Sequence, residues 1–201
     1  TGSGKSVFAN FIICNWCMSA IPEHLEIYGI DAKAVELTKY HLGDIAMPHF
    51  KVIAGTKDVE YVLSVIDFFL EKMAEQNAKL SVVHASDVES YYEKTGIRLP
   101  ARVLLIDELG ELLRRCNAKQ LALIEKKLDS IGALGRNTQH VIVFATQVVP
   151  SELGQNILSH FGIRSCLKVG EQRISELALG AGNDAGYYIK QRGFCHVNHT
   201  Q

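Results

Sequence analysis

Hydrophobic residues follow two different periods along the chain, and each period predicts one kind of element. Between Asp58 and Lys79 they recur at the three- and four-residue spacing of an amphipathic helix, and helices are also expected at 119–134 and 173–179. Short apolar stretches predict strands, the central ones buried on both faces, at 25–30, 52–54, 103–106, 141–145 and 163–169. Strands that alternate with helices are typical of an α/β domain with a mostly parallel sheet.

Residues 6–22 form the first apolar segment and carry no charge. The segment is close to the length that spans a membrane, but two asparagines and a serine interrupt it and Lys5 directly precedes it. It has neither a basic leader region nor a small-residue cleavage site. We therefore expect a helix buried within the domain, ended by Pro22.

The composition fits a single domain over residues 1–201 with a sizeable core, because 47% of the residues are hydrophobic. The polar residues 81–101 are expected to be an internal linker or insertion with one short helix near 87–94. Twenty-one basic residues against twenty-two acidic ones give a net charge of −1, which excludes a protein that coats nucleic acid by bulk charge. An odd count of five cysteines indicates reduced thiols in a cytosolic compartment.

The chain begins with the final part of the phosphate-loop motif G-x-x-x-x-G-K-[ST]. Its glycines let successive N–H groups surround phosphate oxygens, and the helix that follows adds its dipole. We predict that Lys5 contacts the β- and γ-phosphates of ATP and that Ser6 gives its hydroxyl to Mg²⁺. The predicted nucleotide-binding residues are Thr1, Gly2, Ser3, Gly4, Lys5, Ser6 and Val7. The alternative is a Gly/Ser-rich turn that contains a lysine by chance.

The chain begins inside a motif, so we expect it to be part of a longer protein. Any membrane anchor would lie outside these residues.

A phosphate loop requires an acidic partner at the end of a buried strand, and the run that ends in Asp107-Glu108 supplies one. Asp107 is predicted to hold Mg²⁺, directly or through water, and Glu108 to polarise the attacking water. A glutamate directly after the aspartate favours hydrolases and motors over nucleotide kinases. The alternative is an acidic turn at a strand end, which is common in isolation.

Gln147 ends the next predicted strand, after Thr146. Its side-chain amide is placed to report whether the γ-phosphate is present. The alternative is a strand-end residue that hydrogen-bonds only the backbone.

Four segments together resemble the FtsK/SpoIIIE family of DNA translocases: the phosphate loop at 1–6, the stretch Ile30–Leu37, Leu104–Glu108, and His140–Gln147. The family usually has a proline where this chain has Ala32, and Arg-Pro where it has Val148-Val149-Pro150. The resemblance extends over essentially the whole chain in a consistent order.

The resemblance implies a RecA-like P-loop NTPase domain that acts as an ATPase in a homohexameric ring around double-stranded DNA. It implies ATP and Mg²⁺ as cofactors, and a cytoplasmic domain of a membrane-associated bacterial protein. Conjugative transfer and chromosome segregation are both roles within the family. Type VII secretion ATPases also belong to it, so a protein cargo is the alternative, and a nucleotide-binding module that assembles without turnover is a third.

The resemblance also implies ATP sites that are shared between neighbouring subunits. Such sites need a cation that one subunit supplies in trans to the transition-state phosphate of the next. Arg136 lies where the family commonly has a Gly-Arg pair, although its spacing to His140 is one residue short. Arg164 and Arg173 match later arginines of the family and are the alternatives, together with a plain surface role.

Two further motifs are interpreted as structural. Cys14 and Cys17 form a lone C-x-x-C, and thiols of the core are favoured over a zinc or redox site. His196 and His199 form a lone H-x-x-H without a neighbouring carboxylate, so no metal is expected there.

Overall fold

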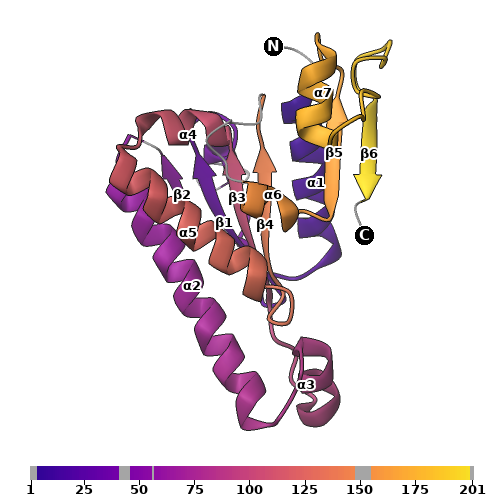
Figure 1. Cartoon of the computed structure of the whole chain (residues 1–201). Helices are drawn as coiled ribbons and strands as arrows, with labels where there is room; N and C mark the ends of the chain where they lie inside the picture. The colour runs from indigo at the N-terminus through magenta and orange to yellow at the C-terminus, as the bar shows by residue number, and fades with distance from the viewer. Residues whose placement is uncertain (1–3, 41–45, 56, 148–154, 200–201) are drawn as a thin grey trace.

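The computed structural model describes residues 4–40, 46–55, 57–147 and 155–199 (Figure 1). A parallel sheet lies at its centre with the spatial order β2-β1-β3-β4. Its strands are β1 (Leu25–Asp31), β2 (Phe50–Gly55), β3 (Ala101–Asp107) and β4 (His140–Ala145). Because the strands are parallel, their carboxyl ends meet at one edge. The predicted α/β arrangement with a parallel sheet is confirmed.

Two further strands, β5 (Ile163–Leu167) and β6 (Cys195–His199), form a separate antiparallel pair. The apolar run at 163–169 predicts β5 correctly. The sequence analysis missed β6, because Cys-His-Val-Asn-His has too few strongly apolar residues to mark a strand.

The helices predicted at 58–79, 119–134 and 173–179 are confirmed within a few residues. The structure has α1 (Lys5–Ser19), α2 (Val59–Val82), α3 (Val88–Thr95), α4 (Leu109–Arg115), α5 (Ala118–Leu134), α6 (Gln155–Ser159) and α7 (Gln172–Leu179), with a 3₁₀ turn at Thr38–Tyr40. The short α4 was not predicted, because seven residues are too few to establish a helical period.

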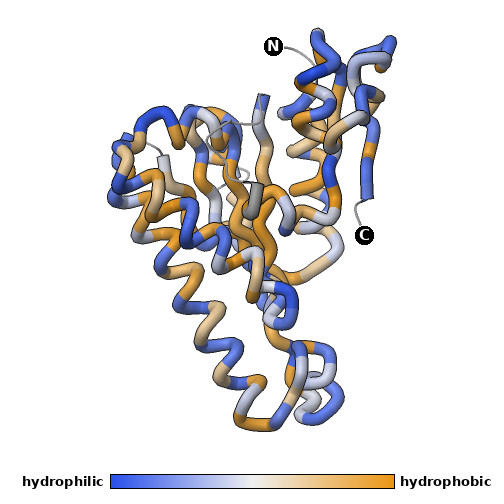
Figure 2. Tube along the Cα trace, in the orientation of Figure 1, coloured by the Kyte–Doolittle hydropathy of each residue, from blue (hydrophilic) through white to orange (hydrophobic). Residues whose placement is uncertain are grey.

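Alternate residues of the central strands pack on opposite faces of the sheet. Tyr28 of β1 and Leu104 of β3 belong to the core shared with α2 and α5. Ile27 and Val103 belong to the core shared with Ile13 of α1. The sheet is therefore the middle of three layers, and apolar positions concentrate along its strands (Figure 2).

Helix α1 differs from the expectation of a buried helix. Ile13 is its one buried residue, whereas Phe11 is 63% and Met18 87% exposed. The reason is that only one side of α1 packs on the sheet, while its other side has no neighbour among the residues that the structure describes. Over the same residues, no helix is both long and apolar enough to cross a membrane.

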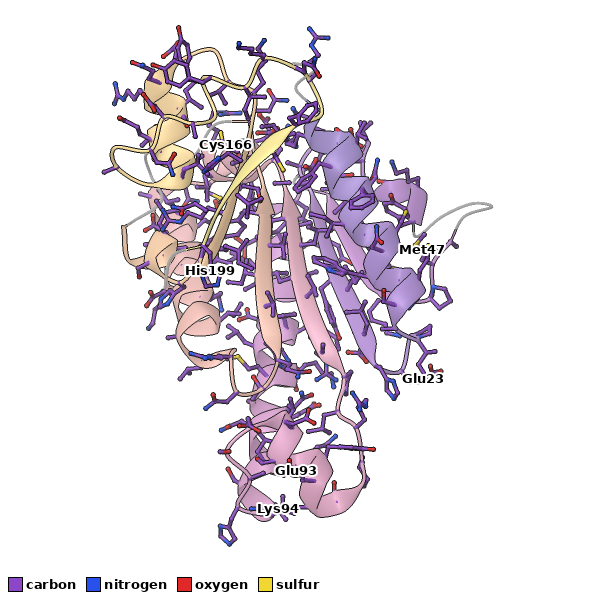
Figure 3. The ribbon with its side chains drawn as sticks, turned by 90° about the vertical axis from the view of Figure 1, so that its right-hand side faces the viewer. Glu23, Met47, Glu93, Lys94, Cys166 and His199 are labelled. Atoms are coloured by element: carbon purple, nitrogen blue, oxygen red, sulfur yellow. The ribbon has the colours of Figure 1, made fainter. Side chains whose placement is uncertain are left out.

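The polar segment 81–101 contains α3, as predicted. Asp87 caps this helix by accepting a hydrogen bond from the Ser90 N–H, and Gly96 ends it in a left-handed conformation. Glu93 and Lys94 of α3 lie at the opposite end of the molecule from Cys166 of β5 (Figure 3). The segment thus extends the domain at the amino ends of the strands.

His140 begins β4 as a buried, neutral side chain. Its Nδ1 lies 2.8 Å from the Thr138 carbonyl oxygen, and its ring packs edge-on against Phe69. Its Nε2 has no hydrogen-bond partner within the described part of the chain. Burial, with a smaller effect of the Arg102 charge, lowers the pKa of His140 from 6.5 to about 4.

Acid should therefore destabilise the fold through His140. Between pH 6.5 and about 4 the unfolded chain binds this proton and the folded chain does not, so the free energy of unfolding falls as the pH falls. The loss is at most about 3 kcal/mol. The variant His140→Phe keeps an aromatic ring beside Phe69. Urea unfolding of this variant at several pH values should show a smaller dependence of the free energy of unfolding on pH between 6.5 and about 4.

The matched control is His196→Gln, because His196 is exposed on β6. An unchanged pH slope in His140→Phe would contradict the assignment of this proton to His140.

Candidate nucleotide site

The first element of the candidate site is the amino end of α1. Gly4 precedes the helix with φ 103°, a left-handed conformation that side-chain-bearing residues rarely adopt. The first helical hydrogen bond joins the Phe8 N–H to the Gly4 carbonyl, so the N–H groups of Lys5, Ser6 and Val7 are left at the open end of the helix. Such N–H groups, together with the helix dipole, favour an anion at this position.

The second element is the carboxyl end of β3, which meets the phosphate loop as the sequence predicts. The Lys5 Nζ lies 2.5 Å from Asp107 Oδ1 and 3.4 Å from Glu108 Oε2. Asp107 and Glu108 are each 5% exposed. One lysine therefore faces two nearly buried carboxyl groups from residues about a hundred positions later in the chain.

Glu108 has an unusual backbone, with φ 59° and ψ 57°. The left-handed conformation costs a non-glycine residue about 1–3 kcal/mol, and such residues are enriched at functional sites as well as in turns. The N–H of Glu108 donates a hydrogen bond of 2.6 Å to the Ala145 carbonyl of β4, so the backbone is held to the sheet at the point where it turns. The turn of the chain here points the Glu108 side chain back to the edge of the sheet, where Lys5 lies.

Both carboxyl oxygens of Glu108 are engaged. Oε1 accepts from the Gln147 N–H at 3.1 Å and the Thr146 hydroxyl at 3.4 Å, while Oε2 faces Lys5 and Lys33 at 3.4 Å each. Burial alone would raise the pKa of Glu108, but the Gln147 hydrogen bond and the two lysines lower it below its ordinary value. Glu108 is therefore ionised at neutral pH.

The opposite balance holds at Asp107. Burial raises its pKa and the neighbouring charges of Asp31 and Glu108 add to the rise, although Lys5 pulls it down. The carboxyl groups of Asp31, Asp107 and Glu108 outnumber the two lysines at this edge. A bound cation would offset that excess of negative charge.

The third element, which the sequence analysis did not assign, is the segment 32–37 directly after β1, here called the β1 loop. Asp31 pairs in register with Asp107 and is fully buried. Its Oδ1 accepts from the Lys33 N–H at 3.1 Å and its Oδ2 from the Leu37 N–H at 2.7 Å, which closes the loop. The Lys33 side chain thereby reaches Glu108.

The β1 loop also reaches the phosphate loop, because the Ser6 hydroxyl donates a 2.7 Å hydrogen bond to Glu36 Oε1. The oxygen atoms of Ser6, Asp107 and Glu36 are the hard donors that Mg²⁺ prefers. No group of three or more His, Cys, Asp or Glu side chains arranged to hold a metal occurs among the described residues. Mg²⁺ keeps several waters and is usually bound by one or two protein carboxylates together with substrate phosphates.

The sequence signal for these residues was a pair of charged residues, Lys33 and Glu36, directly after a buried strand and within the stretch Ile30–Leu37 that carries part of the family resemblance. That position places Asp31, Lys33 and Glu36 at the same edge as Asp107. What the pattern did not give is the conformation of the loop, which depends on the two hydrogen bonds to Asp31.

The remaining predicted residues fall into separate places. Thr1, Gly2 and Ser3 lie outside the described residues. Gln147 lies at the site, but the atom in contact is its backbone N–H, and its residue is exposed. A side-chain role in detecting the γ-phosphate therefore stays a prediction.

The three candidate arginines lie in three different parts of the fold. Arg136 is exposed in the turn between α5 and β4, at the amino ends of the strands and so at the opposite edge of the sheet. Arg164 is partly buried and donates a 2.6 Å hydrogen bond to the Leu158 carbonyl. Arg173 is exposed on α7. A role in trans for any of them stays a prediction.

The cysteine and histidine motifs have structural explanations. All five cysteines are free thiols, and burial, with Cys14 nearby, raises the pKa of Cys17 to about 11, which makes that thiol unreactive. His196 and His199 are three positions apart on β6, so their side chains point to opposite faces of the strand.

A surface hollow of about 480 Å³ lies elsewhere, between the end of α1 and α3. Tyr92, Arg98 and Gln139 are among its lining residues. It is at the amino ends of the strands, opposite the phosphate loop, and does not coincide with the candidate site.

Curated relatives are DNA translocases. The DNA translocase FtsK of Caldanaerobacter subterraneus subsp. tengcongensis is 28% identical over 194 residues, which cover 91% of this chain and 26% of the relative. That of Borreliella burgdorferi is 27% identical over 188 residues, covering 90% of this chain and 23% of the relative. The chain thus spans about a quarter of the length of these relatives.

Solved structures share the fold. The pCW3 conjugation coupling protein TcpA, in a monomer form with ATPγS, superposes with a TM-score of 0.80 at 21% identity, over 99% of this chain and 55% of that one. The cytoplasmic domain of the type VII secretion ATPase EccC of Thermomonospora curvata gives 0.82 at 20% identity, over 100% of this chain and 23% of that one. At such identities the likeness shows the fold alone. The predicted RecA-like P-loop NTPase fold is confirmed.

The sequence profile of the FtsK/SpoIIIE family matches residues 1–147, which include the phosphate loop, the acidic end of β3 and Gln147. This matched region contains all the side chains that meet at the candidate site. The chain belongs to the FtsK/SpoIIIE family.

Proposed function

We propose that the chain is an ATPase motor domain that moves double-stranded DNA as a homohexameric ring. The observation that carries the proposal is the meeting of Lys5 with Asp107 and Glu108 at the open end of α1. A cation, a metal-binding carboxyl group and an ionised glutamate beside a phosphate loop are what hydrolysis of a nucleoside triphosphate requires.

The binding step uses groups that are already in place. The N–H groups at the start of α1 receive phosphate oxygens, and Lys5 exchanges its contact with Asp107 for the β- and γ-phosphates. Bound Mg²⁺ would supply positive charge that offsets the negative charge developing on the phosphates. Ser6 and Asp107 are the residues that would hold it.

The hydrolytic step depends on Glu108. Because its pKa is low, the side chain is a carboxylate at neutral pH and can orient a water and accept its proton. The hydrogen bonds from Thr146 and Gln147 fix the direction of this carboxylate. The same contacts join Glu108 to the residues directly after β4, so a change in the position of Glu108 would act on Thr146 and Gln147.

DNA is the favoured cargo because the curated relatives named above are DNA translocases. The net charge of −1 requires that the contacts with DNA come from a few placed residues of each subunit. The fold shared with EccC keeps a secretion ATPase with a protein cargo as the second candidate.

DNA should stimulate the ATPase. In the full-length protein, at concentrations that allow a ring to form, linear double-stranded DNA is expected to raise the steady-state rate. Lys5→Ala should lower that rate by about 10²-fold or more, because it removes the cation that stabilises the transferring phosphate. A measurable rate that DNA does not change would favour the secretion ATPase instead.

Glu108→Gln should separate turnover from binding. We expect kcat to fall about 10²- to 10⁴-fold, since the general base is lost, while the Kd for ATP changes little. Equilibrium binding of a fluorescent ATP analogue beside the steady-state assay checks both. A variant with normal turnover would contradict the role of Glu108 and support a module that binds nucleotide only to assemble.

Arg136 is proposed to serve the site of a neighbouring subunit, because it lies one strand length, about 17 Å, from the site edge of its own sheet. Arg136→Ala should lower kcat by about 10³-fold. Mixing it with Lys5→Ala should recover activity, because a Lys5→Ala subunit still offers an intact arginine to a neighbour with an intact site.

The exposed Arg173 provides the matched control, because Arg173→Ala should keep a normal kcat by itself. If Arg173→Ala were instead inactive alone and regained activity when mixed with Lys5→Ala, the role would pass to Arg173. A mixture of Arg136→Ala and Lys5→Ala that stays inactive would count against a shared site.

A further inference from the structure

Glu36 contacts the side chain from which Mg²⁺ is expected to take an oxygen. The Ser6 hydroxyl donates its hydrogen to Glu36 Oε1 at 2.7 Å, across thirty positions of sequence. This is a short hydrogen bond to a carboxyl group, and it joins the β1 loop to the phosphate loop. The side chain of Glu36 is 30% exposed, so it lies at the rim of the site.

The direction of this hydrogen bond decides what it does to Ser6. A hydroxyl has one hydrogen to donate and two lone pairs. When the hydrogen is committed to Glu36, both lone pairs of the oxygen are left for a cation. Outer partners of this kind orient a metal ligand, and their loss typically lowers metal affinity about 10- to 100-fold.

The backbone on both sides of Glu36 is fixed by hydrogen bonds to the core of the domain. The next residue, Leu37, is buried, and its N–H donates to Asp31 Oδ2 at 2.7 Å. The Ala32 N–H bonds the Asp107 carbonyl at 3.3 Å, which joins the start of the loop to β3. Glu36 is thus tied to the same strand end that supplies Asp107.

A second charged partner lies close to Glu36. The Lys39 Nζ is 3.8 Å from Glu36 Oε2, the oxygen that does not contact Ser6. The two residues are three positions apart in the sequence and the pair lies at the surface, where such pairs contribute little. It provides a control that removes a contact of Glu36 without touching Ser6.

We propose that Glu36 is a positioning residue of the metal site: it accepts the Ser6 hydrogen and so turns the Ser6 oxygen toward Mg²⁺. The inference rests on the proposed function, because it assumes that the site binds a nucleotide with Mg²⁺. Glu36 acts through Ser6 and takes no part in the bond-breaking step.

The test is the contribution of Mg²⁺ to nucleotide binding rather than the reaction rate. The Kd of a fluorescent ADP analogue is measured with the full-length protein in Mg²⁺ and in EDTA. We expect Glu36→Ala to weaken binding about tenfold in Mg²⁺ and to leave binding in EDTA unchanged. Glu36→Gln, which keeps an acceptor oxygen, should recover part of the loss.

A double-mutant cycle tests the route through Ser6. In a Ser6→Ala background, Glu36→Ala should have no further effect on the Mg²⁺-dependent part of binding. Lys39→Gln is the matched control within the loop and should behave as the wild type. Thermal unfolding of each variant separates a loss of the fold from a loss of the metal contact.

Two outcomes would overturn the inference. An unchanged ratio of the two Kd values in Glu36→Ala contradicts a role at the metal, and equal weakening in Mg²⁺ and in EDTA is the form of this outcome that shows a purely structural role. An undiminished effect in the Ser6→Ala background contradicts the route through Ser6. If the wild type itself binds no nucleotide, it is the proposed function that fails, and the inference fails with it.

Discussion

The ion pair between Lys5 and Asp107 is the contact on which the site depends. It joins the start of α1 to the end of the central strand, and both side chains are largely buried. Burial raises the pKa of Asp107, and Lys5 limits the rise, so the two groups need each other while the site holds no ligand. A nucleotide with its metal offers each partner a replacement, phosphate for Lys5 and a cation for Asp107. The exchange is possible because Lys5 keeps a negative partner and Asp107 keeps a positive one.

The sequence predicted the parts of the fold in which local pattern and tertiary structure agree. The strand that ends at Asp107 and the helix capped by Asp58 each combine a clear hydrophobic pattern with a clear boundary residue. Helix α1 was different, because its all-round apolar surface predicts burial, whereas the described chain covers only one side of it. Hydrophobicity indicates that a face needs a partner, but not which part of the protein supplies it.

The residues of the candidate site that could be predicted are those that belong to a motif in which each position has a known role. Lys5, Asp107 and Glu108 follow from the motif and from the rule that parallel strands end at one edge. Lys33 and Glu36 did not follow, because their positions depend on the hydrogen bonds that Asp31 makes to the β1 loop. For Gln147 the pattern correctly indicated a residue at the site, but it named the side-chain amide, whereas the atom in contact is the backbone N–H. The backbone N–H donates a hydrogen bond to the Glu108 carboxylate, and the residue types in a sequence do not reveal which backbone groups make such contacts.

The charge of the domain limits how the proposed motor could hold DNA. The carboxyl ends of the strands carry Asp31, Glu36, Asp107 and Glu108, so this edge repels a polyanion unless cations compensate it. In the proposed motor, contacts with DNA would then lie elsewhere on the surface and be few in each subunit, because the net charge is −1. Weak contacts become effective when several are linked, since each further one forms at a high effective concentration. In the proposed ring, assembly would therefore be a condition both for a complete ATP site and for a grip on the DNA, and the two activities would appear together.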